Sequence, residues 1–246
     1  MTSRPTIRLS LLLLALVSLV ASAAAHAECC IVADNGAGTA TLPPITTGAT
    51  CIYLGTSEIT AGLPAGTTIQ IVASFGFFIN QNEYAGGGLG GTVSEWDGLF
   101  EMQMTGTGAL TGFNHTVQLP MTGFQTNMME WGPRAAYAPV QTAVADVYRL
   151  YGQTLSHPQF DLLRVTGGND FGMPSPGQIQ LVQTGGGWAV SGYFDLTHRI
   201  DFIGSPTGSL AGYSGSTALQ RRFEMCPQTV ADVDATWSNV KAMYGG

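Results

Sequence analysis

Three acidic residues lie close together in the segment Glu95-Trp96-Asp97-Gly98-Leu99-Phe100-Glu101. Side chains two positions apart on a strand point to the same face, so Glu95, Asp97 and Glu101 would share one face. Secreted β-jelly-roll glycosidases use paired carboxylates of this kind. Glu95 and Asp97 would hold their carboxyl groups roughly 7 Å apart, which suits inverting hydrolysis, whereas Glu95 and Glu101 would lie about 20 Å apart. Glu95 and Asp97 are therefore the candidate catalytic pair, although a solvated strand face opposite Phe100 is the favoured interpretation.

Tryptophans with acidic neighbours form a second set of candidates. Trp96 lies between Glu95 and Asp97, and Trp131 follows Glu130. Exposed aromatic rings serve sugar-binding β-sandwiches as stacking platforms, whereas most tryptophans in such domains fill the core. Trp96 and Trp131 are the candidate glycan-binding residues, with Trp188 as a further possibility.

Motifs for cofactors and metals are not supported by their surroundings. The segment 86–91 matches G-x-G-x-x-G in form, but a strand rather than a helix is expected after it, so it predicts a turn. His115, His157 and His198 lie far apart in sequence without paired ligand spacing, and the chain has no Cys-x-x-Cys motif. We expect no metal, nucleotide or other cofactor.

The charge balance excludes several classes of partner. The chain carries 9 Lys and Arg residues against 16 Asp and Glu residues, and Lys241 is its only lysine. So few cations leave no patch for phosphate groups, which argues against nucleic acid and anionic membrane surfaces as partners. Only 10% of the residues are charged, and 33 are glycines. This composition is typical of a secreted β-rich protein with one sizeable core.

Alternating apolar and polar residues recur between Gly-rich turns, which predicts antiparallel strands with one buried face. The fold class we expect is all-β: a single antiparallel β-sandwich, jelly-roll-like, with a short C-terminal helix. The segment 146–154 fits either a helical stripe or a strand, and its Val and Tyr content favours a strand. The expected strands span residues 68–75, 100–105, 116–119, 159–165, 178–182, 188–203 and 216–225.

One short pattern occurs twice. Gly108-Ala109-Leu110-Thr111-Gly112-Phe113 returns as Gly208-Ser209-Leu210-Ala211-Gly212-Tyr213, and each copy follows an alternating strand. We interpret the copies as two equivalent turns whose leucine and aromatic side chains plug an end of the core. Chance similarity in a Gly-rich sequence is the alternative.

The chain ends suggest export. Residues 1–27 have the form of a signal peptide, with basic Arg4 and Arg8, an apolar stretch, and a cleavage site at Ala25-His26-Ala27. We expect a β-sandwich domain at 28–228 and an amphipathic helix or tail at 229–246, and no membrane span in the mature chain. The expected location is secreted or cell-surface, with the periplasm also open.

All four cysteines follow the expected cleavage site, which suits an oxidising compartment. They are Cys29, Cys30, Cys51 and Cys226. A bond between the adjacent Cys29 and Cys30 would need a strained ring. The two remaining pairings each join one of this pair to Cys51 and the other to Cys226, and the spacing leaves both open.

Several segments carry a resemblance to a known group. The Cys-Cys start at 29–39, the segments at 63–68 and 106–113, and Phe171-Gly172-Met173-Pro174-Ser175-Pro176-Gly177 resemble secreted bacterial β-rich domains of planctomycete-like and related genomes. The resemblance covers most of residues 29–220. It implies export and a β-rich fold, and it implies no activity.

The sequence therefore favours a non-catalytic extracellular or cell-surface module that acts in adhesion or polysaccharide binding, with a glycan or a surface protein as partner. The first alternative is a secreted carbohydrate-active hydrolase that uses Glu95 and Asp97. The second is a small outer-membrane β-barrel, which alternating strands would permit.

Overall fold

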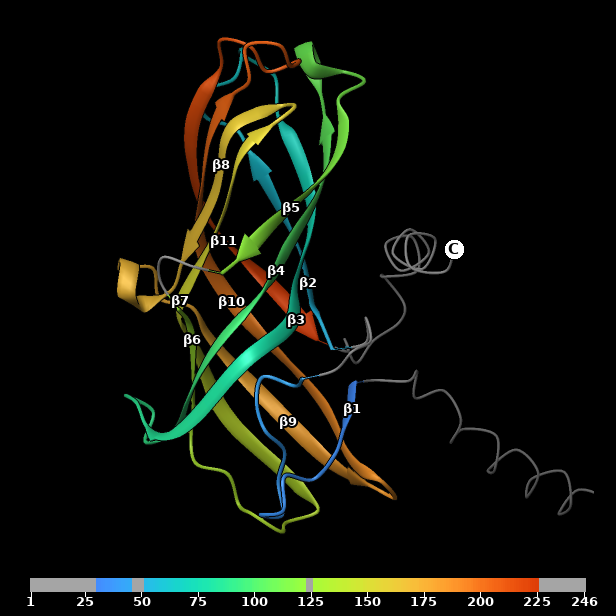
Figure 1. Cartoon of the computed structure of the whole chain (residues 1–246), viewed down its shortest axis with the longest axis vertical. Helices are drawn as coiled ribbons and strands as arrows, with labels where there is room; N and C mark the ends of the chain where they lie inside the picture. The colour runs from blue at the N-terminus through green and yellow to red at the C-terminus, as the bar shows by residue number, and fades with distance from the viewer. Residues whose placement is uncertain (1–29, 46–50, 123–125, 226–246) are drawn as a thin grey trace, which may run out of the picture.

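The structure, a computed structural model, describes residues 30–45, 51–122 and 126–225 (Figure 1). In this part, the chain forms one antiparallel sheet of eleven strands with two short 3-10 helices, η1 and η2. The all-β antiparallel fold expected from the sequence is confirmed. The elements are β1 Cys30–Val32, β2 Tyr53–Ile59, β3 Ile69–Gly86, β4 Gly91–Gly106, η1 Gly108–Leu110, β5 Asn114–Met121, β6 Asn127–Trp131, β7 Val140–His157, β8 Phe160–Gly167, η2 Asn169–Phe171, β9 Pro176–Thr184, β10 Gly187–Gly204 and β11 Ser214–Met225.

Four long strands, β3, β4, β7 and β10, run most of the length of the molecule, and shorter strands pair beside them (Figure 1). β8 and β9 both lie between β7 and β10 and pair with both of them. β9 pairs with the first part of each long strand, and β8 pairs with the last part. β5 and β6 divide the edge of β4 in the same way, and β11 and β1 divide the edge of β10. Because β8 joins β7 to β10, the path of paired strands closes on itself, and opposite parts of the sheet face one another like the layers of a sandwich.

This arrangement gives the molecule two halves. We call the part bounded by β2, β5, β8 and β11 the upper half, and the part bounded by β1, β6 and β9 the lower half, as they lie in Figure 1. The long strands cross both halves. Their alternation fills one continuous core, in which Phe75, Phe100 and Phe223 of the upper half and Trp131 and Trp188 of the lower half are buried.

The segment 146–154 is a strand, as its composition favoured. It forms the middle of β7, which pairs with β8 on the upper side and β9 on the lower side. Val147 and Leu150 are buried in the core, whereas Val140 and Val144 are half exposed. The valine spacing that also fitted a helix thus spans both faces of one long strand.

The repeated pattern closes the upper end, as predicted. Leu110 and Leu210 are both buried, and their turns make matching backbone hydrogen bonds. The Phe113 N–H donates to the Leu110 carbonyl, and the Tyr213 N–H donates to the Leu210 carbonyl 100 residues later. Both turns lie at the top of the molecule in Figure 1.

A segment without regular structure, residues 33–45, fills the lower half. Ala40 and Leu42 within it are fully buried. Thr39 Oγ1 donates to Gln141 Oε1 over 2.6 Å, and Gln141 Nε2 donates to the Gly38 carbonyl over 2.6 Å. The Arg134 guanidinium donates to the Ala40 carbonyl over 2.6 Å. Hydrogen bonds from β7 and from Arg134, which precedes β7 in the chain, therefore hold this segment inside the sheet.

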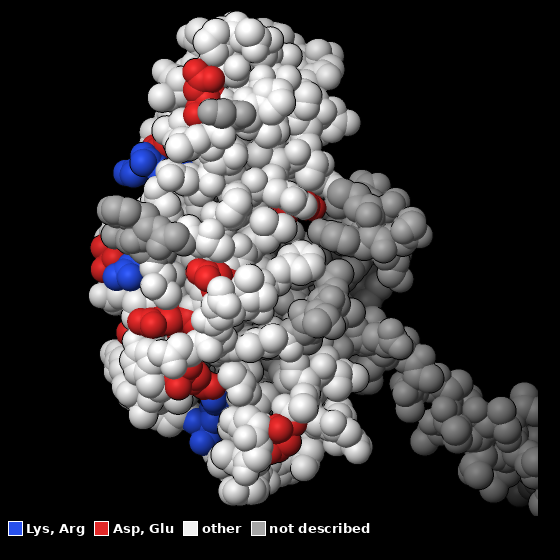
Figure 2. Space-filling view, viewed as in Figure 1, with Lys and Arg blue, Asp and Glu red and all other residues white. Residues whose placement is uncertain are grey.

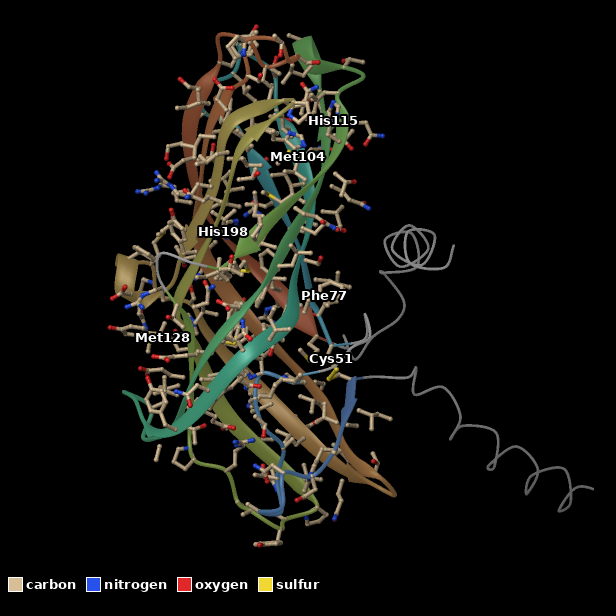
Figure 3. The ribbon with its side chains drawn as sticks, viewed as in Figure 1. Cys51, Phe77, Met104, His115, Met128 and His198 are labelled. Atoms are coloured by element: carbon tan, nitrogen blue, oxygen red, sulfur yellow. A yellow bond between two sulfur atoms is a disulfide. The ribbon has the colours of Figure 1, made fainter. Side chains whose placement is uncertain are left out.

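One disulfide joins Cys30 at the start of β1 to Cys51 just before β2 (Figure 3 labels Cys51). Such a bond fits an oxidising, non-cytoplasmic compartment. Cys29 and Cys226 lie outside the described residues. The expected signal peptide and the expected helix at 229–246 lie outside them as well.

Candidate functional site

The predicted acidic residues share one face of β4, as the alternation required, but each has a structural partner. Tyr84 donates its hydroxyl to Glu95 Oε1 over 3.3 Å, and the Asn80 side chain donates to Asp97 Oδ2 over 2.8 Å. Glu101 is buried, with 8% of its surface exposed, and it accepts a hydrogen bond of 2.7 Å from Gln118.

The tryptophans are not surface platforms, and this prediction is wrong for a clear physical reason. Trp96 and Trp131 are both 0% exposed and Trp188 is 1% exposed, so none can stack on a sugar ring. Trp96 packs edge-on against Phe78 at 4.9 Å. Trp131 Nε1 donates to Ser94 Oγ over 2.9 Å. Trp96 follows the same alternation as the buried Phe100, which was the signal in the sequence.

A groove of about 730 Å³ lies on the outer face of the upper half, across β2, β3, β4 and β5. Sequence reasoning did not identify it. The pairing of these four strands aligns its side chains in two rows. The first row is Glu58, Gln70, Thr105 and Asn114, and the second is Thr56, Val72, Gln103 and Thr116.

The dimensions of the groove follow from sheet geometry. Neighbouring strands lie about 4.8 Å apart, so each row of four is about 14 Å long. The rows are two residues apart along the strands, which separates them by about 7 Å. The groove therefore presents hydroxyl and amide groups at regular spacing, with the apolar Val72 among them.

The charged groups of the groove lie at one end, where an acidic and a basic side chain form an ion pair. Arg221 of β11 donates to Glu58 Oε1 over 2.7 Å, and each side chain is more than one third exposed. Figure 2 shows the same character for the visible surface, where charged side chains are scattered spots on an otherwise uncharged surface. The groove thus suits a neutral ligand better than an anion or a cation.

A serine–histidine hydrogen bond lies beneath this end of the groove. Ser57, which also lines the groove, places Oγ 2.9 Å from Nε2 of His198, and His198 Nδ1 lies 3.2 Å from the Leu196 carbonyl (Figure 3 labels His198). Because a carbonyl only accepts, Nδ1 carries the proton and the Ser57 hydroxyl donates to Nε2.

The Ser57–His198 hydrogen bond has the direction found between a catalytic serine and its histidine base. The surroundings of His198, however, do not suit catalysis. His198 is 0% exposed, so it could not pass a proton to a leaving group or to water. Burial first, and the nearby Arg221 charge second, lower the pKa of His198 to about 4, which makes it a weak base at neutral pH. The pair therefore joins β2 to β10 inside the core and supports the groove from below.

The outer face of the lower half is different. Val140 of β7 pairs with Val182 of β9, Val182 pairs with Ala189 of β10, and Ala189 pairs with Ile31 of β1. Val140, Val182 and Ile31 are 51%, 39% and 54% exposed. We call these four residues the apolar row.

Two further observations concern the described part of the chain. Within residues 30–45, 51–122 and 126–225, no three His, Cys, Asp or Glu side chains lie where they could share a metal ion. No helix in these ranges has the length and apolar character needed to cross a membrane.

Comparison with known proteins found no relative. No family model, no curated protein and no solved structure matches the chain.

Proposed function

We propose that this chain is a secreted, non-catalytic module that binds a neutral polysaccharide in the groove on β2 to β5. The observation that supports the proposal is the pair of cross-strand rows, in which hydroxyl and amide side chains repeat at strand spacing. Each amide both donates and accepts hydrogen bonds, and each hydroxyl does so too. A polyhydroxylated ligand needs this combination.

The other features of the groove agree with such a ligand. Val72 gives the C–H face of a sugar ring an apolar contact, and the Glu58–Arg221 pair adds two charge-assisted hydrogen-bonding groups without adding net charge. The candidate acids Glu95 and Asp97 are not among the residues that line the groove. Binding without hydrolysis is therefore the function that this geometry favours.

The test measures depletion of the oxidised chain from solution by cellulose, chitin and insoluble xylan. We expect one of them to remove the chain in a saturable manner. The double variant Gln70→Ala/Gln103→Ala loses hydrogen bonds of roughly 0.5–1.5 kcal/mol each, so its affinity should fall about tenfold. Gln178→Ala/Gln180→Ala, which removes two amides from β9 in the lower half, is the matched control and should bind as the wild type does.

Two outcomes would overturn the proposal: depletion by none of these polysaccharides, or equal loss of binding in both double variants. A third variant, Glu95→Gln/Asp97→Asn, separates binding from hydrolysis. It should bind normally, and neither it nor the wild type should release reducing sugar. Release by the wild type alone would establish the hydrolase instead.

A further inference from the structure

The groove on β2 to β5 is longer across the strands than along them. Its outward side chains come from four adjacent strands but from only two rows. Four strands at a spacing of about 4.8 Å give a length of about 14 Å, whereas the two rows are about 7 Å apart. Neighbouring strands rotate by roughly 20–25° about the axis that runs across them, and this rotation leaves the rows straight. An elongated ligand therefore fits along the rows, across the strands.

Hydrogen-bonded pairs of side chains border the groove on both sides. On its upper side, Thr68 Oγ1 and Thr107 Oγ1 lie 2.7 Å apart. On its lower side, the Gln118 amide donates to Glu101 Oε2 over 2.7 Å. None of these four residues lines the groove. The groove is thus two rows wide, which is room for one sugar chain and not for the face of a stack of chains.

The repeat along the groove matches one kind of sugar chain. Each pyranose in a β-1,4-linked chain advances the chain by a distance close to the spacing between strands. Such a chain is straight, so each successive sugar meets the next strand at the same place. Chains with α-1,4 or β-1,3 linkages curve, and they leave a straight row after one or two residues. The straight rows therefore favour β-1,4 linkage.

Both rows carry polar groups, as the two edges of such a chain require. Consecutive rings of a β-1,4-linked chain are turned over relative to one another, so each edge of the chain presents hydroxyl groups along its whole length. Amides and hydroxyls can donate and accept toward those groups. The first row supplies two amides and one hydroxyl, and the second row supplies one amide and two hydroxyls. Each edge of the chain therefore finds partners.

We infer that the ligand is a β-1,4-linked chain that lies along the two rows, with one sugar residue on each of β2, β3, β4 and β5. This inference rests on the proposed function, to which it adds the linkage, the direction and the length of the bound segment. The Glu58–Arg221 ion pair lies at the β2 end of the groove. Asn114 and Thr116 of β5 form the other end. Four consecutive sugar residues fill the groove.

The test measures how binding depends on ligand length. Cello-, chito- and xylo-oligosaccharides of two to six residues are titrated into the oxidised full chain in a calorimeter. In the series that binds, each residue added up to the fourth should lower the Kd about two- to tenfold, because it adds hydrogen bonds. The fifth and sixth residues should change the Kd by less than about twofold. Starch and curdlan, which are α-1,4- and β-1,3-linked glucans, should not deplete the chain from solution.

A variant locates one end of the bound segment. Asn114→Ala/Thr116→Ala removes the polar side chains that β5 contributes to the groove. Its Kd should stop falling at three residues instead of four, and its Kd for the trisaccharide should stay within about twofold of the wild-type value. Gln178→Ala/Gln180→Ala, on β9 in the lower half, is the matched control and should keep the limit at four residues.

The outcomes separate this inference from the proposed function. A Kd that stops falling at two residues, a Kd that keeps falling through six, or depletion by curdlan or starch as strong as by a β-1,4-linked polysaccharide would overturn the inference alone. Absence of binding to every polysaccharide and oligosaccharide would overturn both. The wild-type series decides the matter even if the β5 variant fails to fold.

Discussion

The upper and lower halves of the molecule share four long strands, yet their ends are closed by different means. Two copies of one turn close the upper end, and each copy buries a leucine through hydrogen bonds within its own six residues. The segment 33–45 fills the lower half, where side chains more than 90 residues away hold its backbone. Both upper turns share a local hydrogen-bond pattern, to which the Ala109 and Ser209 N–H groups add long-range bonds, whereas long-range side-chain hydrogen bonds predominate around the buried part of the lower segment.

The same division holds for the outer surfaces and the buried titratable groups. The upper half carries the polar groove and buries His198, whereas the lower half carries the apolar row and buries Asp146. Strand alternation requires only that inward side chains be apolar or hydrogen-bonded, and it leaves the outer face free. One closed sheet can therefore carry two surfaces suited to different partners.

The largest effect on stability should come from the buried leucines at the two ends of the molecule. Leu210→Ala in the upper end and Leu42→Ala in the lower end both remove a fully buried side chain. Each should lower the free energy of unfolding by about 2–5 kcal/mol, measured by denaturant titration. Ser209→Ala, an exposed position in the upper turn, should change it by less than about 0.5 kcal/mol. A loss below 1 kcal/mol for Leu42→Ala alone would mean that the lower end is loosely packed.

The turns that close the upper end could be predicted from the sequence, whereas the segment that fills the lower half could not. Leu110 and Leu210 stand in the same place of a repeated pattern, so their shared role could be predicted from spacing alone. Leu42 lies in a segment without periodicity. Its burial depends on Gln81 and Ser94, whose side chains both donate to its carbonyl from β3 and β4. Contacts of that kind exist only after the sheet has closed.

Acid should affect the two halves in opposite directions. Burial lowers the pKa of His198 to about 4, below the unfolded value of 6.5, so its contribution to stability is lost as the pH falls from 6.5 toward 4. Burial raises the pKa of Asp146 to about 6, so the cost of its charge is relieved as the pH falls through 6 toward 4. Each effect amounts to roughly 3 kcal/mol, and in the wild type the two oppose one another.

Single variants separate the two effects. Asp146→Asn keeps an oxygen that accepts from Asn169, and its free energy of unfolding should fall by roughly 3 kcal/mol between pH 6.5 and 4 relative to the wild type. For His198→Gln, the free energy of unfolding should instead rise by a similar amount between pH 6.5 and 4 relative to the wild type. Parallel curves for both variants, measured by denaturant titration across this range, would contradict the assignment of opposite signs.

The hydrogen bonds that hold the lower segment should have a smaller effect. Gln141→Leu leaves the buried Thr39 hydroxyl without its acceptor and removes one of two donors to the Gly38 carbonyl, which keeps the Tyr137 N–H, at a cost of about 1–3 kcal/mol. Gln178→Leu, on the exposed outer face of β9, is the matched control. Equal thermal unfolding midpoints for the two variants would show that the long-range contacts do not stabilise the lower end.

The candidate site shows the same limit on prediction. The polar faces of β3 and β4 were visible in the alternation around Gln70 and Gln103, and the burial of Trp96 could have been deduced from its phase with Phe100. The groove could not be predicted, because it depends on the register that brings β2 and β5 beside those strands. Register depends on turn geometry and on packing across the whole closed sheet.

The smallest effect on stability should come from the apolar row, where the contrast between the two surfaces is sharpest. Val140→Thr/Val182→Thr changes two half-exposed positions that pair across β7 and β9, so the free energy of unfolding should change by less than about 0.5 kcal/mol per site. Retention on a hydrophobic resin should nevertheless fall, because these valines make the lower surface apolar. Thr56→Ser in the groove, a matched change in the upper half, should leave retention unaltered. Equal retention of the wild type and both variants would show that the outer surface of the lower half is not more apolar than that of the upper half.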